Sequence, residues 1–484
     1  MTRILLCLLL AAVSLSAQFP TPLERSGYTK LTTNAELVEY VTMVDAAVPF
    51  IRTETMALST GGKSIPAVIV STGGNTEKLT VLIFAQQHGN EPSGKEGALM
   101  LLRDIAGGKL DQVLASVDLV LVPQMNPDGN DINIRRNGRG MDLNRNHLIM
   151  TEPEVIGLHE LALRYAPDVT LDVHEYSPWG ETWKAWGYRE NADETYGTMT
   201  NINTSAALRT MQKKEFLPFI EAFLAERGFS YLEYNVGGPP NVERIRNSTV
   251  DINDGRQSFG ILGAFSMIQE GMNGRDSIDN IKHRSEGQCA AMTGYLTFAA
   301  KNAERIRAEV AKARAEVKKP KKVHIQMEHV FEAPREQRYF SYASQRETTL
   351  VLTNYHTKVE PRLTVEQPKG YLVPKSDTLL ADFLAKHHIV HTAYAPKKKE
   401  KVMQYRVTYG TKPVFEEFEL PVSAAVKEEV KGVKGAEYWF VPVMQPHSTM
   451  LTLALEPHSM INLLQYERFA HLMKDPLYPV LRVE

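Results

Sequence analysis

The first residues in the chain that can do chemistry together are a histidine and a glutamate three positions apart. His88 and Glu91 stand in FAQQHGNEPSG, directly after the apolar run LTVLIFA, which predicts a buried strand. Gly89 and Asn90 between them permit a tight bend, so an imidazole and a carboxylate can converge on one metal ion. Open α/β sheets build their sites at such strand ends. Alone the pair is a weak indication, because a surface histidine beside a glutamate is an equally good interpretation.

A second histidine follows another predicted strand. His174 lies in LDVHEYS, just after the strand predicted for residues 169–173. Two histidines and a glutamate form the ligand set of a catalytic zinc ion, with a fourth position open to water. We therefore expect His88, Glu91 and His174 to bind one Zn²⁺. Glu175 should point away from this site, because side chains alternate along a strand.

A third candidate is Glu270, which ends the apolar segment SMIQ and precedes Gly271. A carboxylate at such a position is costly to bury without a partner. It can cap a turn, or it can be the general base that takes a proton from a metal-activated water. Beside the predicted metal ligands we interpret Glu270 as the base.

The segment NPDGNDINIRRNGRGMDLNRNH combines several arginines with several asparagines. An arginine suits a carboxylate substrate, because its planar guanidinium binds both oxygens and stays charged. A second arginine can polarise the scissile carbonyl and stabilise the oxyanion. By itself the segment is equally well interpreted as a polar, turn-rich loop. The candidates are Arg135, Arg136, Arg139, Arg145, Asn126, Asn137, Asn144 and Asn146.

Alternating strands and helices must position these residues from about residue 60 to 300. The predicted strands cover 64–71, 79–85, 117–123, 169–173 and 261–269. Helices are predicted from Pro92 onward, over 154–165, and as one long helix from about 288 to 317. This order predicts an α/β domain with a largely parallel or mixed sheet.

The character of the sequence changes after a lysine-rich boundary at 318–322. Strands are predicted at 347–355 and 438–444, and a short helix at 376–386. We therefore expect a catalytic domain over 18–318 and a smaller, β-rich accessory domain over 323–484.

Composition and the amino terminus limit where this chain acts. The 484 residues are 43% hydrophobic and carry a formal charge of −2, which allows a large core and argues against a nucleic-acid partner. Residues 1–17 have the layout of a secretory signal peptide, and their apolar run is too short to span a bilayer. A membrane anchor and a mispredicted start are the alternatives. We expect a secreted or periplasmic protein without a stable membrane anchor after cleavage, with Cys289 as its only, buried thiol.

Taken together, these motifs resemble those of the zinc metallocarboxypeptidases of the carboxypeptidase A type. The resemblance rests on HGNE, NPDG, RNGRGMDLNRN, VHEYS and the strand-final Glu270, over roughly residues 30–300. The segment LALEPHSMINLLQYERFAHL is similar to bacterial secreted members with an extra C-terminal region. The resemblance implies an α/β/α sandwich around a twisted mixed sheet, one zinc ion and a peptide substrate.

The resemblance also implies roles for the remaining candidates. Glu270 would be the base and later the proton donor to the leaving amine. Arg135 would polarise the carbonyl, or Arg136 if the alignment shifts by one residue. Asn144 and Arg145 would hold the terminal carboxylate of the substrate. A further carboxylate, Asp142, would orient the first zinc-binding histidine.

The chain departs from the family where a substrate-contacting tyrosine normally precedes the catalytic glutamate by about twenty residues. Ser248 stands at that position, and Tyr234 is the nearest tyrosine upstream. Arg256 could line the position of the substrate side chain or form a structural salt bridge. Three functions therefore stay open: a carboxypeptidase, a zinc amidohydrolase acting on cell-wall peptides or acylated amino acids, and a non-catalytic binding protein. Residues 18–60 are too short for a folded prodomain, so we expect no zymogen.

Overall fold

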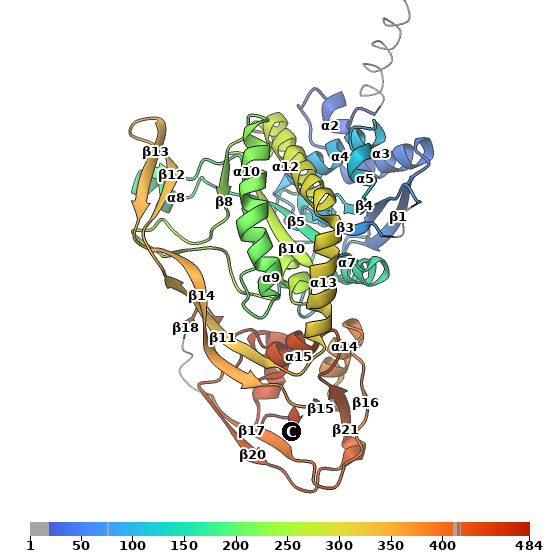
Figure 1. The fold of residues 1–484 in the computed structure, drawn as a ribbon, viewed down its shortest axis with the longest axis vertical. Coiled ribbons are helices and arrows are strands. Elements are labelled where there is room, and N and C mark those ends of the chain that lie inside the picture. Colours follow the sequence, from blue (N-terminus) through green and yellow to red (C-terminus); the bar gives the residue numbers. More distant parts are fainter. Residues whose placement is uncertain (1–18, 75–76, 410–413, 417) are drawn as a thin grey trace, which may run out of the picture.

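A computed structural model describes residues 19–74, 77–409, 414–416 and 418–484 (Figure 1). The predicted signal peptide, 1–17, lies outside the described residues. Among the residues described, no helix is both long and apolar enough to cross a membrane.

An eight-stranded mixed sheet forms the centre of the larger, N-terminal unit. The central strands run parallel, whereas the first two and the β10–β7 pair are antiparallel. In spatial order the strands are β1 (Ile51–Leu58), β2 (Ser64–Val70), β4 (Val117–Val122), β3 (Leu79–Ala85), β5 (Val169–Tyr176), β10 (Phe265–Met272), β7 (Glu194–Gly197) and β8 (Tyr231–Glu233).

Helices cover both faces of this sheet, because successive side chains of its buried strands point to opposite sides. On β3, Val81 and Ile83 join the core formed with α4 and α12, whereas Leu82 and Phe84 join a second core with α7. The predicted α/β/α sandwich is therefore confirmed. The main helices are α3 (Asn34–Ala47), α4 (Pro92–Ala106), α7 (Pro153–Tyr165), α9 (Ala206–Met211), α10 (Leu217–Ala225), α11 (Gly255–Gly260), α12 (Ile281–Lys301) and α13 (Ala303–Val317).

The remaining elements of this unit are short. They are α2 (Pro22–Arg25), α5 (Asp111–Leu114), α6 (Pro127–Asp131), η1 (Leu143–Arg145), α8 (Glu181–Trp186), β6 (Tyr188–Arg189), the π-helical turn η2 (Gln212–Phe216) and β9 (Ile245–Arg246).

Three predicted elements are wrong in their bounds. The strand predicted at 347–355 ends at Leu352, before a turn that leads into the next strand at Tyr355. The strand predicted at 261–269 begins only at Phe265, because α11 ends at Gly260 and Gly263 turns the chain with a φ of +95°. The helix predicted over 288–317 begins at Ile281 and breaks at Asn302, whose side-chain amide donates to the Phe298 carbonyl at 2.9 Å. Such local bonds compete with the helix ladder.

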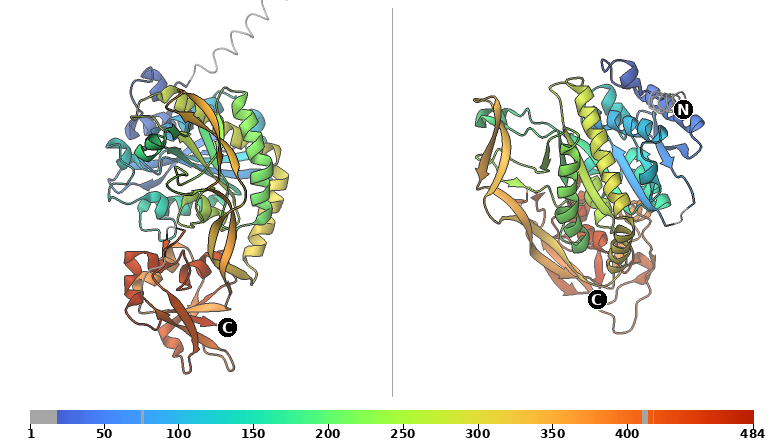
Figure 2. Two further views of the ribbon diagram at one scale, coloured as in Figure 1. Left: turned by 90° about the vertical axis from the view of Figure 1, so that its left-hand side faces the viewer. Right: turned by 45° about the horizontal axis from the view of Figure 1, so that its top comes forward.

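The C-terminal region is rich in strands, as predicted, but it does not stay apart from the N-terminal unit. A long ribbon of β11 and β14 rises beside the larger unit, and the β12–β13 hairpin lies at its far end (Figures 1 and 2). Strand β12 pairs with β6, and β14 pairs with β9. These strands are β11 (Lys322–Phe331), β12 (Arg335–Ser341), β13 (Arg346–Leu352) and β14 (Tyr355–Glu366).

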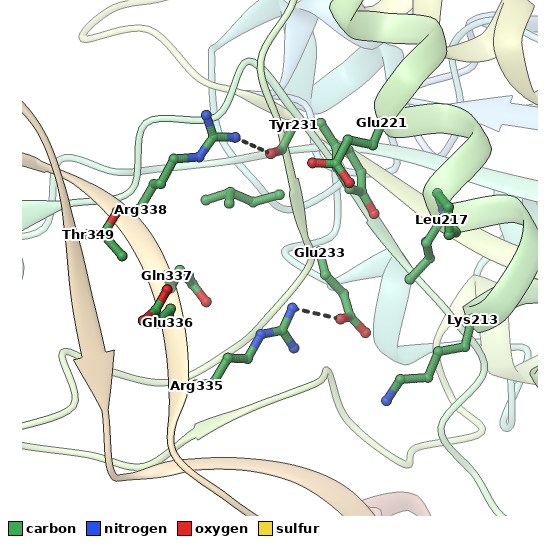
Figure 3. Close-up of a pocket in the computed structure, with 12 residues that line it drawn as sticks. Lys213, Leu217, Glu221, Tyr231, Glu233, Arg335, Glu336, Gln337, Arg338 and Thr349 are labelled. Carbon is green, nitrogen blue, oxygen red and sulfur yellow. Dashed lines mark hydrogen bonds and ion pairs between the residues drawn. The ribbon is translucent and has the colours of Figure 1, made fainter.

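The hairpin is held to the edge of the large sheet across a cavity of about 410 Å³. Arg335 forms an ion pair with Glu233 at 2.9 Å, and Arg338 donates to the Tyr231 carbonyl at 3.3 Å (Figure 3). The two partners belong to β8, so residues far beyond 318 brace the last strand of the sheet.

The end of the chain forms a six-stranded sheet with two helices. Its core also contains residues from the larger unit, namely Leu148, Ile149, Val250, Ile252 and Ile261. This shared core crosses the predicted boundary near residue 320. The elements are β15 (Gly370–Pro374), α14 (Thr378–Lys386), β16 (Thr392–Ala393), β17 (Val402–Thr408), β18 (Val414–Phe415), β19 (Phe418–Glu419), β20 (Ala424–Glu429), η3 (Gly435–Glu437), β21 (Tyr438–Pro442), α15 (Ser448–Leu455), η4 (Leu463–Gln465), η5 (Glu467–Met473) and β22 (Leu481–Val483).

Candidate metal centre

His88 and Glu91 lie in the turn that follows β3, at the carboxyl edge of the parallel strands. A side chain at Gly89 would collide with the backbone of Gly129, so this tight turn requires a glycine. Glu91 directly precedes α4, which begins with Pro92 at a position that suits proline. The turn brings Oε1 of Glu91 to 2.8 Å from Nδ1 of His88.

His174 completes a cluster of three buried side chains from the neighbouring strand β5. Its Nδ1 atom lies 3.1 Å from Nδ1 of His88 and 2.9 Å from Oε2 of Glu91. Ligand atoms around a tetrahedral zinc ion, each about 2.0–2.1 Å from the metal, lie about 3.3 Å from one another. The three side chains are therefore arranged as a nearly formed metal site, and these residues could together hold one ion.

Each of the two histidines has a further carboxylate facing its Nε2 atom. Asp142 lies 3.2 Å from Nε2 of His88, and Asp172 lies 2.8 Å from Nε2 of His174. A carboxylate at this position favours the tautomer that leaves Nδ1 free for a metal. Asp172 is a further residue of this centre, beyond those predicted from the sequence. Its signal is the spacing from His174 by two residues, which puts both side chains on one face of β5.

The charged groups at the centre shift the pKa values of one another. Burial opposes ionisation of Glu91, but the nearby His88 and His174 outweigh it and lower the pKa of this carboxyl. Asp142 behaves alike, since His88 and Arg135 overcome burial and lower its pKa. Burial favours the neutral form of His174, yet Asp172 and Glu91 raise its pKa well above the ordinary value. The centre is thus rich in negative charge and attracts cations.

Glu270 lies on β10 directly opposite His174 of β5. Its side chain is only 7% exposed, and burial raises the pKa of the carboxyl to about 8. The charge of His174 opposes this rise, whereas Glu91 and Asp172 add to it. A bound cation would lower the pKa again, because it favours the ionised form. The structure brings the predicted base to the predicted ligands.

Arg135 reaches the same centre, whereas Arg136 does not. Nε of Arg135 donates to Asp142 at 2.9 Å, and its Nη1 lies 3.7 Å from Oε1 of Glu91. The side chain of Arg135 remains 44% exposed, so it borders both the centre and solvent. Arg136 instead turns back to donate to the Gly140 carbonyl at 2.9 Å.

Asn144 and Arg145 occupy different surroundings. The amide of Asn144 is buried, with its nitrogen 3.2 Å from Nε2 of His174. Its oxygen accepts hydrogen bonds from Gln87 and from the backbone N–H of Gly255. Arg145 is exposed and donates to the Asn144 carbonyl at 2.7 Å. Asn144 therefore packs behind His174 and does not face solvent, and the exposed guanidinium of Arg145 is the one open to a substrate.

Glu175 points away from the centre, as alternation along the strand predicts. Its carboxylate is buried and accepts two hydrogen bonds from Arg284, at 2.7 and 3.0 Å, and one from the backbone N–H of Ser93. Ser248, in the position expected for a tyrosine, is buried and adopts a left-handed φ of 79°.

Comparison with known proteins points to one family. The sequence model described as zinc carboxypeptidase matches residues 37–222. Carboxypeptidase 2 of Trichophyton tonsurans is 26% identical over 195 residues, which cover 39% of this chain and 36% of the relative. Carboxypeptidase 2 of Trichophyton rubrum is 22% identical over 314 residues, which cover 62% of this chain and 57% of the relative. The chain thus spans between a third and three fifths of the length of these relatives.

Among solved structures, a metallo-carboxypeptidase from Burkholderia cenocepacia is similar with 19% identity and a TM-score of 0.43, over 57% of this chain and 71% of that one. The family match contains His88, Glu91 and His174 and ends before Glu270. Through this matched segment, the chain is similar to the zinc carboxypeptidases.

Proposed function

We propose that this protein is a zinc-dependent carboxypeptidase that hydrolyses the last peptide bond of a peptide. One observation carries the proposal: the Nδ1 atoms of His88 and His174 and the carboxylate of Glu91 converge within 2.8–3.1 Å, with Glu270 in register beside them. The Nε2 atoms of the two histidines face carboxylates, so their Nδ1 atoms are left to bind a zinc ion together with Glu91.

Each side chain has a part in the proposed reaction. A bound Zn²⁺ would act as a Lewis acid and lower the pKa of a neighbouring water. The carboxylate of Glu270 accepts the proton of the attacking water and then delivers it to the leaving amine. Arg135 donates to the oxyanion that develops on the scissile carbonyl. Arg145 binds the terminal carboxylate of the peptide through paired N–H groups. Asn144 packs behind His174.

The test compares two peptides of one sequence, one with a free and one with an amidated carboxyl terminus. The metal is first removed with a chelator and then restored as Zn²⁺, and the products are identified by mass spectrometry. We expect one zinc ion per chain and release of a single residue from the free peptide only. Equal cleavage of both peptides would reject the terminal-carboxylate role of Arg145.

The same assay separates the alternatives. Turnover of acylated amino acids or cell-wall peptides, without turnover of ordinary peptides, would favour the zinc amidohydrolase. Bound zinc without turnover of any of these would favour a binding protein.

We propose further that residues 1–17 direct export and that 18–318 and 323–484 act as catalytic and accessory domains. The strand-rich C-terminal region supports the second assignment, although its hairpin pairs with β6 and its core is shared with the larger unit. The accessory role we propose is therefore to brace the catalytic unit. Comparing the mature N-terminal residue of the exported protein with Gln18 tests the cleavage site.

A further inference from the structure

Arg256 of α11 is a buried cation whose hydrogen bonds are incomplete. The side chain is 1% exposed, and its Nη2 donates to Asp254 at 3.0 Å. Its Nε and Nη1 atoms have no hydrogen-bond partner among the described residues. Leaving buried donors unpaired costs free energy, and the cost is larger for a charged group. These two N–H groups are therefore available to a further hydrogen-bond acceptor.

The guanidinium lies on the same face of the sheet as the proposed base. Gly197 of β7 pairs with Ile268 of β10. A Cβ at Gly197 would lie 2.6 Å from the Ile268 side chain, 2.7 Å from the Tyr234 ring and 3.0 Å from Nη1 of Arg256. Ile268 and Glu270 are two residues apart on one strand, so their side chains share a face.

Arg256 therefore lies level with Ile268, two residues before Glu270 on β10. Two strand residues span about 7 Å, so the guanidinium lies about that far from Glu270, toward the start of β10. Its place requires the glycine at position 197, because any larger residue would meet both the Tyr234 ring and the guanidinium. This depth fits the side chain of a residue whose peptide bond lies at Glu270 and whose carboxylate reaches Arg145.

Tyr234 connects this position to the proposed active site. Tyr234 is half-buried, and its ring packs beside the same glycine, Gly197, as Nη1 of Arg256. Burial raises the pKa of Tyr234 well above its ordinary value, the charge of Glu270 adds to the rise, and Arg256 and Arg145 oppose it. The tyrosine is thus near the proposed base and both arginines, although the position expected from the family holds Ser248.

We propose that Arg256 binds the side chain of the C-terminal residue of the substrate and selects an acidic one, glutamate or aspartate. The inference rests on the proposed carboxypeptidase function and names its substrate class. A planar guanidinium with two free N–H groups matches a carboxylate. A basic side chain would be repelled, and an apolar one would bury the donors without partners.

Asp254 neutralises part of the charge but leaves these two donors free. Burial raises the pKa of the nearby Asp251 to about 7, against the opposing charge of Arg145. Asp251 is therefore only partly ionised near neutral pH. It makes no hydrogen bond to Nε or Nη1 of Arg256, so a substrate carboxylate can bind these two donors.

The experiment uses the full-length zinc-loaded protein and four peptides that differ only in a C-terminal Glu, Gln, Leu or Lys. We expect kcat/KM for Glu to exceed that for Leu by at least about 100-fold, with Gln between them and Lys last. In Arg256→Met the Glu-to-Leu ratio should fall to about one or below. Arg227→Gln, which removes an exposed arginine on the opposite face of the sheet, should keep the wild-type ratio.

Each outcome decides something. A ratio within one preparation is independent of the folded fraction, so a partly unfolded Arg256→Met sample still reports the preference. Preference of the wild type for Leu or Lys would overturn the inference and leave the carboxypeptidase function standing, as would an unchanged ratio in Arg256→Met. If the wild type hydrolyses none of the four peptides, the proposed function fails, and the inference fails with it.

Discussion

Replacing Asp172 with asparagine tests how the centre holds its metal. Asp172 is fully buried, lies 2.8 Å from Nε2 of His174, and accepts two hydrogen bonds from Gln87 at 2.9 and 3.0 Å. Asparagine keeps the shape but removes the charge that raises the pKa of His174 and fixes its tautomer.

The expected loss follows from that single contact. Removal of such an outer carboxylate weakens metal binding by about 10- to 100-fold, or roughly 1.4–2.8 kcal/mol. Asp142→Asn should cost less, because its contact with His88 is longer, at 3.2 Å, and its side chain is 17% exposed. Competition with a chromophoric chelator measures the zinc Kd of each variant. Asp111→Asn, on the exposed first turn of α5, is the matched control.

The order of the zinc Kd values of the three variants tests whether the two carboxylates tune the histidines. If Asp172→Asn binds zinc as tightly as Asp111→Asn, Asp172 does not tune His174. If Asp142→Asn is the weaker binder of the two, contact distance and burial do not rank the two carboxylates.

Three further predictions concern catalysis, pH and domain contact. Glu270→Gln should lower kcat by about 10²- to 10⁴-fold and retain zinc, and full activity would discard this base. Burial lowers the pKa of His387 from 6.5 to about 3 and that of His447 to about 4, so the folded state resists protonation and stability should fall as pH drops below 6.5. His387→Gln should reduce that fall in thermal unfolding measured at pH 7.5 and 5.0, and an equal fall would exclude His387. Truncation after residue 318 should lower the Tm or solubility, because it uncovers Leu148 and its core neighbours; a truncated chain as stable as the full one would contradict this.

Local pattern accounts for most of what could be predicted. The strand before His88 is a continuous apolar run, which is typical of strands covered on both faces. His88 follows β3 and His174 lies near the carboxyl end of β5, so the place of both histidines at one sheet edge needed only the order of the elements. The spacing of Glu91 from His88 is likewise local. The start of β10 was mispredicted because Gly263 turns the chain within an apolar segment. The end of α12 was mispredicted because the Asn302 side chain bonds to the Phe298 carbonyl within a helix-forming segment.

The sequence by itself determined the candidate ligands, their likeness to a family and the alternation of strands and helices, because these depend on residues close together in the chain. Only the tertiary structure decided which polar groups meet. The contact of Asn144 with His174, the choice of Arg135 over Arg136 and the approach of Arg256 to Tyr234 all depend on loops whose paths no periodicity specifies. The return of the β12–β13 hairpin to β6 spans about 150 residues of chain, and such pairing depends on edges and shapes that exist only once both units have folded.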